Sequence, residues 1–294
     1  MRILAAIVFW LAALSGTAQA QDLPDQQPFL RIEPGMHTAS IQSIGVDAAC
    51  SLMVTGSYDK TARLWALPKG GRGSPKLLKT LRVPISEGNQ GKIYSVALSP
   101  NGKWVAAGGY LAHEADQESV YIFEAATGRL VKRLGGVGEV IYHLAFSPDG
   151  SRLVATLDGG EGIRLWETGS WQLLAEDKDY GDEASYGAAF DSGNRLFTVA
   201  DDGQIRRYGA DGHLEAKGAT QGGKEPFSIA VHPKQAKLAV GFSDSTAVEV
   251  HDALTLKLLY AANTSGISKG SSNGVAWSAD GARLYAGKAT EDPF

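Results

Sequence analysis

The sequence predicts an all-β fold, a β-propeller made of repeated four-stranded units, and three observations indicate it. A pattern of apolar strand, turn and second apolar strand occurs six times, starting at residues 43, 95, 143, 187, 228 and 274. The turns within these pairs include "SPNG", "SPDG" and "SADG", in which proline fixes φ and glycine supplies a positive φ. A third and a fourth strand follow the first five pairs. Four strands per repeat, at a period of 41–52 residues, are typical of propeller blades.

The first strand of each repeat is expected to lie innermost, next to the propeller axis. The third strands read "TARLWAL", "SVYIFEA", "GIRLWET", "QIRRYGA" and "AVEVHDA", and fourth strands such as "KLLKTL" and "HLEAKG" are more polar. We therefore expect the innermost strand of each blade to be the most apolar and the outermost the most polar. The third residue of the first strand is small in every copy, which suggests close approach of neighbouring units: Gly45, Ala97, Ala145, Ala189, Ala230 and Ala276.

The two ends of the repeat region differ from the rest. The sixth copy has only its first two strands before "ATEDPF", and "PFLRIEPGM" (residues 28–36) reads as an orphan outer strand. An open ring would expose unpaired strand edges, which are an aggregation hazard. We therefore expect the propeller to occupy residues 28–294 and to be truncated at its C-terminus, with six or seven blades in the full-length form.

Residues 1–20 have the layout of a cleaved secretory signal peptide. Arg2 supplies the charged start, "ILAAIVFWLAAL" is an apolar run, and "AQA" places small residues before a predicted cleavage after Ala20. An uncleaved membrane anchor is the alternative, but the run is short for a spanning helix. We expect residues 21–27 to be a linker. The mature chain, without a membrane span, is then periplasmic or secreted in a bacterium.

The net charge bears on which partners the protein can bind, and the cysteine content bears on whether a disulfide bond can stabilise it. The formal net charge of the 294 residues is −4 and no basic block occurs, so the electrostatic footprint of a nucleic-acid-binding protein is lacking. Cys50 is the single cysteine, so an intramolecular disulfide is excluded. The core must therefore stabilise the exported chain.

The segment from His37 to Trp65 carries a resemblance to a known family. "GMHT…TGSYDKTARLW" resembles the hallmark of WD40-repeat proteins, and the resemblance covers the chain from about residue 28 to its end. In that family a His, a Ser/Thr, an Asp and a Trp hydrogen-bond within one blade. The resemblance therefore implies a structural set of His37, Ser57, Asp59 and Trp65. Of the other copies, only the third keeps a tryptophan at the last position, as Trp166.

Long loops gather on one face of the predicted propeller. Loops between second and third strands and loops between blades share this face, and "RVPISEGNQGK", "GYLAHEADQES" and "AEDKDYGDEASY" enlarge it. Loops on a rigid scaffold carry function, so we interpret this face as the site of a protein or peptide partner. Its aromatic residues either form a rim for that partner or pack in the core. The candidate residues are Tyr110, His113, Tyr142, Tyr180, Tyr186 and Phe227.

The sequence predicts no catalytic residue, no metal and no cofactor. "HEADQE" (residues 113–118) has no second histidine at a ligand spacing. "EDKDYGDE" (residues 176–183) lacks the alternating acids and the distal glutamate of a calcium loop. None of the six histidines is paired with a serine or cysteine in a recognisable motif.

The predicted function is a non-enzymatic scaffold in the bacterial cell envelope that binds a protein or a peptide. Two alternatives stay open. One is a propeller enzyme or cofactor-binding propeller, although such proteins draw carboxylates, histidines or a metal to the central channel. The other is the propeller part of a larger caspase-like peptidase protein, because WD40 segments of this bacterial type also occur beside such domains.

Overall fold

Consecutive antiparallel strands form six separate sheets in the computed structural model of the chain, which describes residues 35–111, 118–265 and 270–289. The chain divides into two units, residues 1–33 and residues 34–294, and all six sheets lie in the second unit. The predicted signal peptide and linker lie outside the described residues. Five sheets have four strands and the sixth has two, and in each sheet every strand pairs with the next one along the chain. We number these sheets blade 1 to blade 6 in chain order.

The first and second strands of the blades form the hairpins that the repeat predicts. The first strands are β1 (Ile41–Val46), β5 (Ile93–Leu98), β9 (Ile141–Phe146), β13 (Ser185–Phe190), β17 (Pro226–Val231) and β21 (Ser271–Trp277). The second strands are β2 (Leu52–Ser57), β6 (Trp104–Gly109), β10 (Arg152–Leu157), β14 (Leu196–Ala200), β18 (Lys237–Phe242) and β22 (Leu284–Ala289).

Blades 1 to 5 each add a third and a fourth strand. The third strands are β3 (Thr61–Ala66), β7 (Val120–Glu124), β11 (Ile163–Glu167), β15 (Gln204–Tyr208) and β19 (Val248–Asp252). The fourth strands are β4 (Lys76–Arg82), β8 (Leu130–Leu134), β12 (Leu173–Asp177), β16 (Leu214–Ala219) and β20 (Leu258–Ala261). A short 3-10 helix, η1 (Lys69–Gly71), lies in the connection between β3 and β4.

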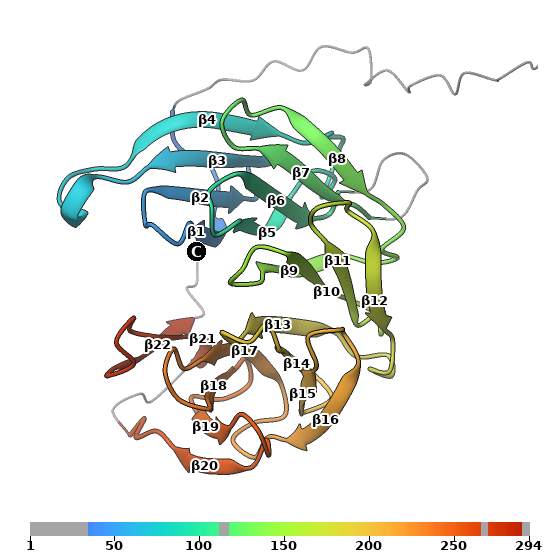
Figure 1. Cartoon of the computed structure of the whole chain (residues 1–294), viewed down its shortest axis with the longest axis vertical. Helices are drawn as coiled ribbons and strands as arrows, with labels where there is room; N and C mark the ends of the chain where they lie inside the picture. Colours follow the sequence, from blue (N-terminus) through green and yellow to red (C-terminus); the bar gives the residue numbers. More distant parts are fainter. Residues whose placement is uncertain (1–34, 112–117, 266–269, 290–294) are drawn as a thin grey trace, which may run out of the picture. The chain divides into compact units, whose positions relative to one another are not determined.

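The first strands of the blades lie around a common centre and the fourth strands lie at the outside (Figure 1). Each first strand contacts the first strand of the next blade, from β1 through β5, β9, β13 and β17 to β21. All six also line one cavity. The predicted all-β propeller, with a sixth blade of two strands, is therefore confirmed.

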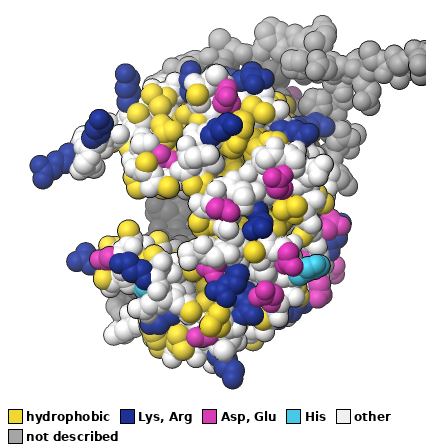
Figure 2. Space-filling view, in the orientation of Figure 1, with side chains coloured by type: hydrophobic (Ala, Val, Ile, Leu, Met, Phe, Trp, Pro, Cys, Tyr) yellow, Lys and Arg dark blue, Asp and Glu magenta, His cyan; other side chains and the backbone are white. Residues whose placement is uncertain are grey.

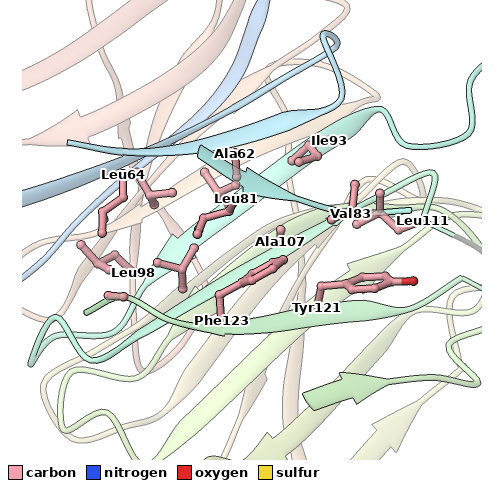
Figure 3. Close-up of a cluster of buried hydrophobic side chains, with 14 residues drawn as sticks. Ala62, Leu64, Leu81, Val83, Ile93, Leu98, Ala107, Leu111, Tyr121 and Phe123 are labelled. Atoms are coloured by element: carbon pink, nitrogen blue, oxygen red, sulfur yellow. The ribbon is translucent and has the colours of Figure 1, made fainter. Parts of the chain in front are cut away.

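Apolar side chains between neighbouring blades form the core. Between blades 1 and 2, Leu64 of β3 and Leu81 of β4 lie in one buried cluster with Ile93 of β5 and Phe123 of β7 (Figure 3). A similar cluster joins blades 2 and 3, another joins blades 3 and 4, and another joins blades 4 and 5. Because each cluster draws on two blades, a blade buries its apolar side chains only when its neighbour is in place.

Burial within a blade does not follow the apolar character expected of its strands. The second strands, not the innermost ones, are the most buried: every residue of β14 is buried, whereas β9 and β17 alternate between buried and half-buried positions. The reason is that first strands face the central cavity on one side, while second strands lie between two blades. The fourth strands are the most exposed, as predicted.

The small residue Gly45 of β1 marks a close approach between blades 1 and 2. A Cβ added at Gly45 would lie 3.1 Å from the backbone nitrogen of Leu98 and 3.3 Å from Cα of Ala97 on β5. These separations are tighter than ordinary van der Waals contacts, so β1 and β5 approach through their backbones at this point.

Candidate functional site

In blade 1, hydrogen bonds join His37 to strand β2, to the turn that follows β2 and, through Thr55, to strand β3. His37 Nδ1 lies 2.9 Å from Asp59 Oδ2, and His37 Nε2 lies 2.7 Å from Thr55 Oγ1. Trp65 Nε1 donates to the same Thr55 hydroxyl at 2.9 Å. Asp59 also accepts from the Thr61 hydroxyl at 2.6 Å. The network therefore ties the segment before β1, strand β2, the turn after it and strand β3 together.

Ser57 does not have the role that the family resemblance implies, and Thr55 takes that role instead. The Ser57 hydroxyl donates to the carbonyl of Ala39 at 3.1 Å and accepts from the backbone N–H of Asp59 at 3.1 Å. It contacts neither His37 nor Trp65 through a hydrogen bond within the described residues. Thr55 and Ser57 lie two residues apart on β2, so both face the same side of the strand, and only the packing of His37 distinguishes them.

The environment of Asp59 keeps its carboxylate ionised. Burial acts to raise its pKa, but hydrogen bonds from His37, Thr61 and the backbone N–H of Thr38, together with the charge interaction with His37, outweigh burial and hold the pKa far below its ordinary value. This set stabilises the turn between β2 and β3, and it offers no free nucleophile or base to a substrate.

Six aromatic side chains form a second feature, which we call the aromatic arc. Four of them are the second residues of their first strands, and two follow the last residue of a second strand. All six are half-buried, so each keeps part of its ring accessible. Its members are Tyr58, Tyr94, Tyr110, Tyr142, Tyr186 and Phe227.

A β-bulge aims each of the four strand-borne rings. In blade 2, Ile93 pairs with Gly109 and Ser95 pairs with Gly108, so Tyr94 between them is the extra, unpaired residue. The same shift in the pairing register isolates Tyr142 in blade 3, Tyr186 in blade 4 and Phe227 in blade 5. Bulges redirect a side chain at the rim of a sheet, and here the redirection recurs blade after blade.

The rings contact one another from blade 1 to blade 5. The centroids of Tyr58 and Tyr94 are 5.0 Å apart, and those of Tyr94 and Tyr142 are 6.1 Å apart. Tyr142 and Tyr186 are 4.7 Å apart, as are Tyr186 and Phe227. Such centroid distances are those of favourable aromatic pairs. The arc is therefore one continuous surface whose rings hold each other in position.

The sixth member, Tyr110, lies beside Tyr94 at a centroid distance of 5.4 Å. The Tyr142 hydroxyl donates to Asp158 Oδ2 at 2.9 Å, so one ring of the arc is fixed by a carboxylate of the adjacent turn. Burial raises the pKa of Tyr94 to about 12, with Tyr58 adding to the shift. The Tyr94 phenol therefore stays protonated at neutral pH, so it can stack and hydrogen-bond but does not supply a phenolate.

A cavity of about 350 Å³ opens between the first strands at the arc. Tyr94, Tyr142, Tyr186 and Phe227 line it, and the lining continues along the strands to residues such as Ile229. A cavity of this size accepts a side chain or a small molecule, but not a helix or a folded domain.

The structure brings together four of the six predicted face residues, Tyr110, Tyr142, Tyr186 and Phe227, with Tyr110 joined to the others through Tyr94. His113 lies outside the described residues. Tyr180 requires a correction: it precedes β13 on the same face, but its side chain is buried and only 1% exposed. It is part of a separate polar network, described next, and offers no surface to a partner.

Tyr180 is buried because its hydroxyl has two partners inside blade 4. These are the hydroxyl of Thr198 at 2.8 Å and the hydroxyl of Tyr208 at 2.7 Å. The Arg206 guanidinium also lies 3.7 Å from the centroid of the Tyr180 ring. The network closes at Asp177, whose carboxylate accepts from Tyr208 at 2.7 Å.

Tyr58 and Tyr94 were not predicted as site residues, although Tyr94 carries a signal. Ser95 in "KIYSVAL" aligns with His143 in "VIYHLAF". Tyr94, one residue earlier, therefore aligns with Tyr142. Alignment of the repeats at this position would have found it. Tyr58 lies in a turn, and the sequence does not indicate that its ring reaches Tyr94.

Two histidines that occupy repeat positions have structural partners. His232 accepts the backbone N–H of Lys234 at 3.0 Å, and His251 Nε2 lies 2.8 Å from Glu249 Oε2. Within residues 35–111, 118–265 and 270–289, no group of three or more His, Cys, Asp or Glu side chains is placed to hold a metal ion. Over the same residues, no helix has the length and apolarity needed to cross a membrane.

Part of the repeat region matches a known family. The model of the WD domain, G-beta repeat family matches residues 34–66, 76–112 and 128–167. The chain is 27% identical over 180 residues to WD repeat-containing protein SL1-17 of Schistosoma mansoni, which covers 60% of the chain and 54% of that protein. It is 31% identical over 166 residues to Coronin-7 of Mus musculus, covering 56% of the chain and 16% of Coronin-7.

A third relative is the small ribosomal subunit protein RACK1y of Oryza sativa subsp. japonica. The chain is 26% identical to it over 170 residues, which are 54% of the chain and 44% of that protein. The matched region thus spans about half of the length of these curated relatives, or less.

Proposed function

We propose that this chain, a WD40-repeat protein, is a non-enzymatic scaffold that binds a protein or peptide segment at the aromatic arc. The observation that carries the proposal is the continuous surface of contacting, half-exposed rings over a cavity, spread across five blades. Tyrosine and phenylalanine are enriched at protein interfaces, because a ring buries much area and loses little conformational entropy.

The family supports this class of function. WD40-repeat proteins serve as protein-interaction scaffolds, and the relatives of this chain include RACK1y and a guanine nucleotide-binding protein subunit beta. The arc lies at the end of the blades that carries the loops between blades and the turns between second and third strands. This is the face on which the loop lengths predicted a partner.

The chemistry of the site supports binding rather than catalysis. Burial raises the pKa values of Tyr94, Tyr110 and Tyr142, and burial together with Asp201 and Asp158 raises the pKa of Tyr186 to about 12. A general base or nucleophile needs the opposite shift, towards neutral pH. Both ring nitrogens of His37 have hydrogen-bond partners within blade 1, Asp59 and Thr55.

The proposal also concerns the cellular location of the protein and the class of its partner. We propose export to the bacterial envelope, on the basis of the signal-peptide layout of residues 1–20 and a mature start after Ala20. On the face drawn in Figure 2, basic and acidic side chains are interspersed, without a wide basic patch. This pattern and the net charge of −4 favour a protein partner over nucleic acid.

Affinity capture with defined variants tests the proposal. The full chain is used as bait in extracts of its own cells, beside Tyr142→Leu, Tyr186→Leu and the control Tyr260→Leu. Tyr260 is 47% exposed on the outer strand β20, away from the arc. We expect a partner that wild type and Tyr260→Leu retain and that both arc variants lose. A retained set that is the same for all four proteins would refute binding at the arc.

A further inference from the structure

The turns beside the aromatic arc change from aromatic to acidic around the propeller. The residue directly after the second strand is Tyr58 in blade 1 and Tyr110 in blade 2, but Asp158 in blade 3 and Asp201 in blade 4. The same position in each blade faces the same side of the propeller. Aromatic side chains therefore border the arc at blades 1 and 2, and carboxylates border it at blades 3 and 4.

Four carboxylates lie in the loops and turns at the ends of the strands of blades 4 and 5, which carry Tyr186 and Phe227, and we call them the acidic cluster: Glu183, Asp201, Glu225 and Asp244. They come from four connections, namely the loop before β13, the turn after β14, the loop before β17 and the turn between β18 and β19. Their segments are joined in pairs by hydrogen bonds: the Asp201 N–H donates to the Ala184 carbonyl at 3.0 Å, and the Glu225 N–H donates to Asp244 Oδ1 at 3.3 Å. Burial and then the negative charge of Glu225 raise the pKa of Asp201 to about 6, and Glu183 and Asp244 add to the shift.

The charge of this cluster is not balanced within the protein. In the part of the chain that the structure describes, none of the four carboxylates forms an ion pair with a lysine or arginine. Asp244 accepts the backbone N–H of Lys224 at 2.8 Å, and Glu225 accepts the hydroxyl of Ser243 at 2.8 Å. Asp201 Oδ1 is buried without a hydrogen-bond partner. Glu183, Glu225 and Asp244 are exposed and Asp201 is half-buried, so the negative charge of the cluster faces solvent, where it attracts a ligand with hydrogen-bond donors and positive charge.

The rings next to the cluster suit a cation as well. A cation near an aromatic face is attracted by the negative charge of that face. The arc already holds one at its other end, where Lys92 Nζ lies 5.0 Å from the centroid of the Tyr58 ring. Between Tyr186 and Phe227, with centroids 4.7 Å apart, no lysine or arginine of the described residues stacks in this way.

We propose that the arc binds an arginine or lysine side chain of an extended segment of a partner protein, which stacks on Tyr186 and Phe227 and pairs with the acidic cluster. The inference rests on the proposed function and names the chemistry of its partner. The cavity has the size for a single side chain, which favours an extended segment over a packed helix face. The carboxylates are not arranged to chelate a metal among the described residues, so the cation is an organic one that brings its own hydrogen-bond donors.

Fluorescence anisotropy with short synthetic peptides tests this proposal directly. The probes are fluorescein-labelled Gly/Ser peptides that carry arginine, lysine, glutamate or citrulline at the same positions. Citrulline has nearly the shape of arginine but no charge. Because ion pairing and the cation–π attraction both need the charge that citrulline lacks, we expect arginine to bind roughly tenfold more tightly than citrulline. Glutamate peptides should not bind.

Two charge-matched double variants locate the effect. In Asp201→Asn/Glu225→Gln the cluster loses two charges, and we expect the affinity for the arginine peptide to fall by about fivefold. In Asp211→Asn/Asp280→Asn the same charge is lost from exposed turns of the opposite face. Each of these two aspartates accepts a backbone N–H that asparagine can also accept, and binding should not change.

The outcomes separate this inference from the proposed function. Equal affinity for arginine and citrulline, equal loss in both double variants, or no binding of any peptide each overturns the cation inference. The scaffold function then still stands or falls with the capture of a partner that depends on Tyr142 and Tyr186. Binding of arginine peptides that depends on the cluster supports the inference, whatever the capture experiment retains.

Discussion

The indole of Trp65 donates from Nε1 to the hydroxyl of Thr55 at 2.9 Å, and the same hydroxyl lies 2.7 Å from His37 Nε2. One oxygen atom therefore joins strand β3 to the segment that precedes β1. Thr55, which is 3% exposed, therefore has the role that the family resemblance implies for Ser57.

We expect Thr55→Val to lower the free energy of unfolding by about 1–3 kcal/mol, because it leaves Trp65 Nε1 and a nitrogen of His37 without a partner. Thr55→Ser keeps the hydroxyl and serves as the matched control. Urea unfolding followed by tryptophan fluorescence measures both. Equal stability of the two variants would show that the hydroxyl is dispensable.

Asp59 should make stability depend on pH in the acid range. Its pKa in the folded protein lies far below the ordinary value of 3.8, so its contribution is present above about pH 4 and is lost as pH falls through the folded pKa. Asp59→Asn should therefore be less stable than wild type by about 1–3 kcal/mol at pH 7, where His37 and Thr61 lose a charged partner. The difference should shrink as the pH falls well below 4. A constant difference from pH 7 to pH 2 would contradict the linkage.

Asp201 should have the opposite effect. Its pKa is raised from 3.8 to about 6, so the stability linked to this group is fully present below about pH 4 and is lost as pH rises through 6. The groups that face it are Glu183, Tyr186, Glu225 and Asp244. Because solvent reaches this site and screens these charges, we expect Asp201→Asn to gain only about 1 kcal/mol at pH 7.

Thermal unfolding of Asp201→Asn and wild type at pH 7.5 and pH 4 measures this gain. The melting temperature of the variant should exceed that of wild type at the higher pH and equal it at the lower one. A variant that is less stable than wild type at pH 7.5 would show that the ionised carboxylate contributes to the fold.

Tyr180→Phe separates a structural tyrosine from the arc tyrosines. It leaves the hydroxyls of Thr198 and Tyr208 with one partner fewer in a buried site, so the free energy of unfolding should fall by about 1–2 kcal/mol. Binding of the arginine peptide should stay unchanged at a temperature where the variant is folded. Lost binding without lost stability would return Tyr180 to the partner face.

The sequence by itself determined the repeat, the hairpins and the order of strands within each blade. These features follow from local chemistry, since proline and glycine fix the turns and apolar runs at a regular period define the strands. The His37, Asp59 and Trp65 side chains of blade 1 could be chosen from sequence because they lie in one motif. Thr55 could not be chosen, because a period of two residues gives Thr55 and Ser57 the same side of β2.

Only the tertiary structure decided which aromatic residues share a surface. Tyr94, Tyr142, Tyr186 and Phe227 are more than forty residues apart in sequence and meet because the blades pack side by side around one axis. A bulge aims each ring, and a bulge changes which face a residue occupies in a way that strand periodicity does not show. Tyr180 is buried for the same reason: its partners come from β14 and β15, and a contact between separate strands is a property of the fold.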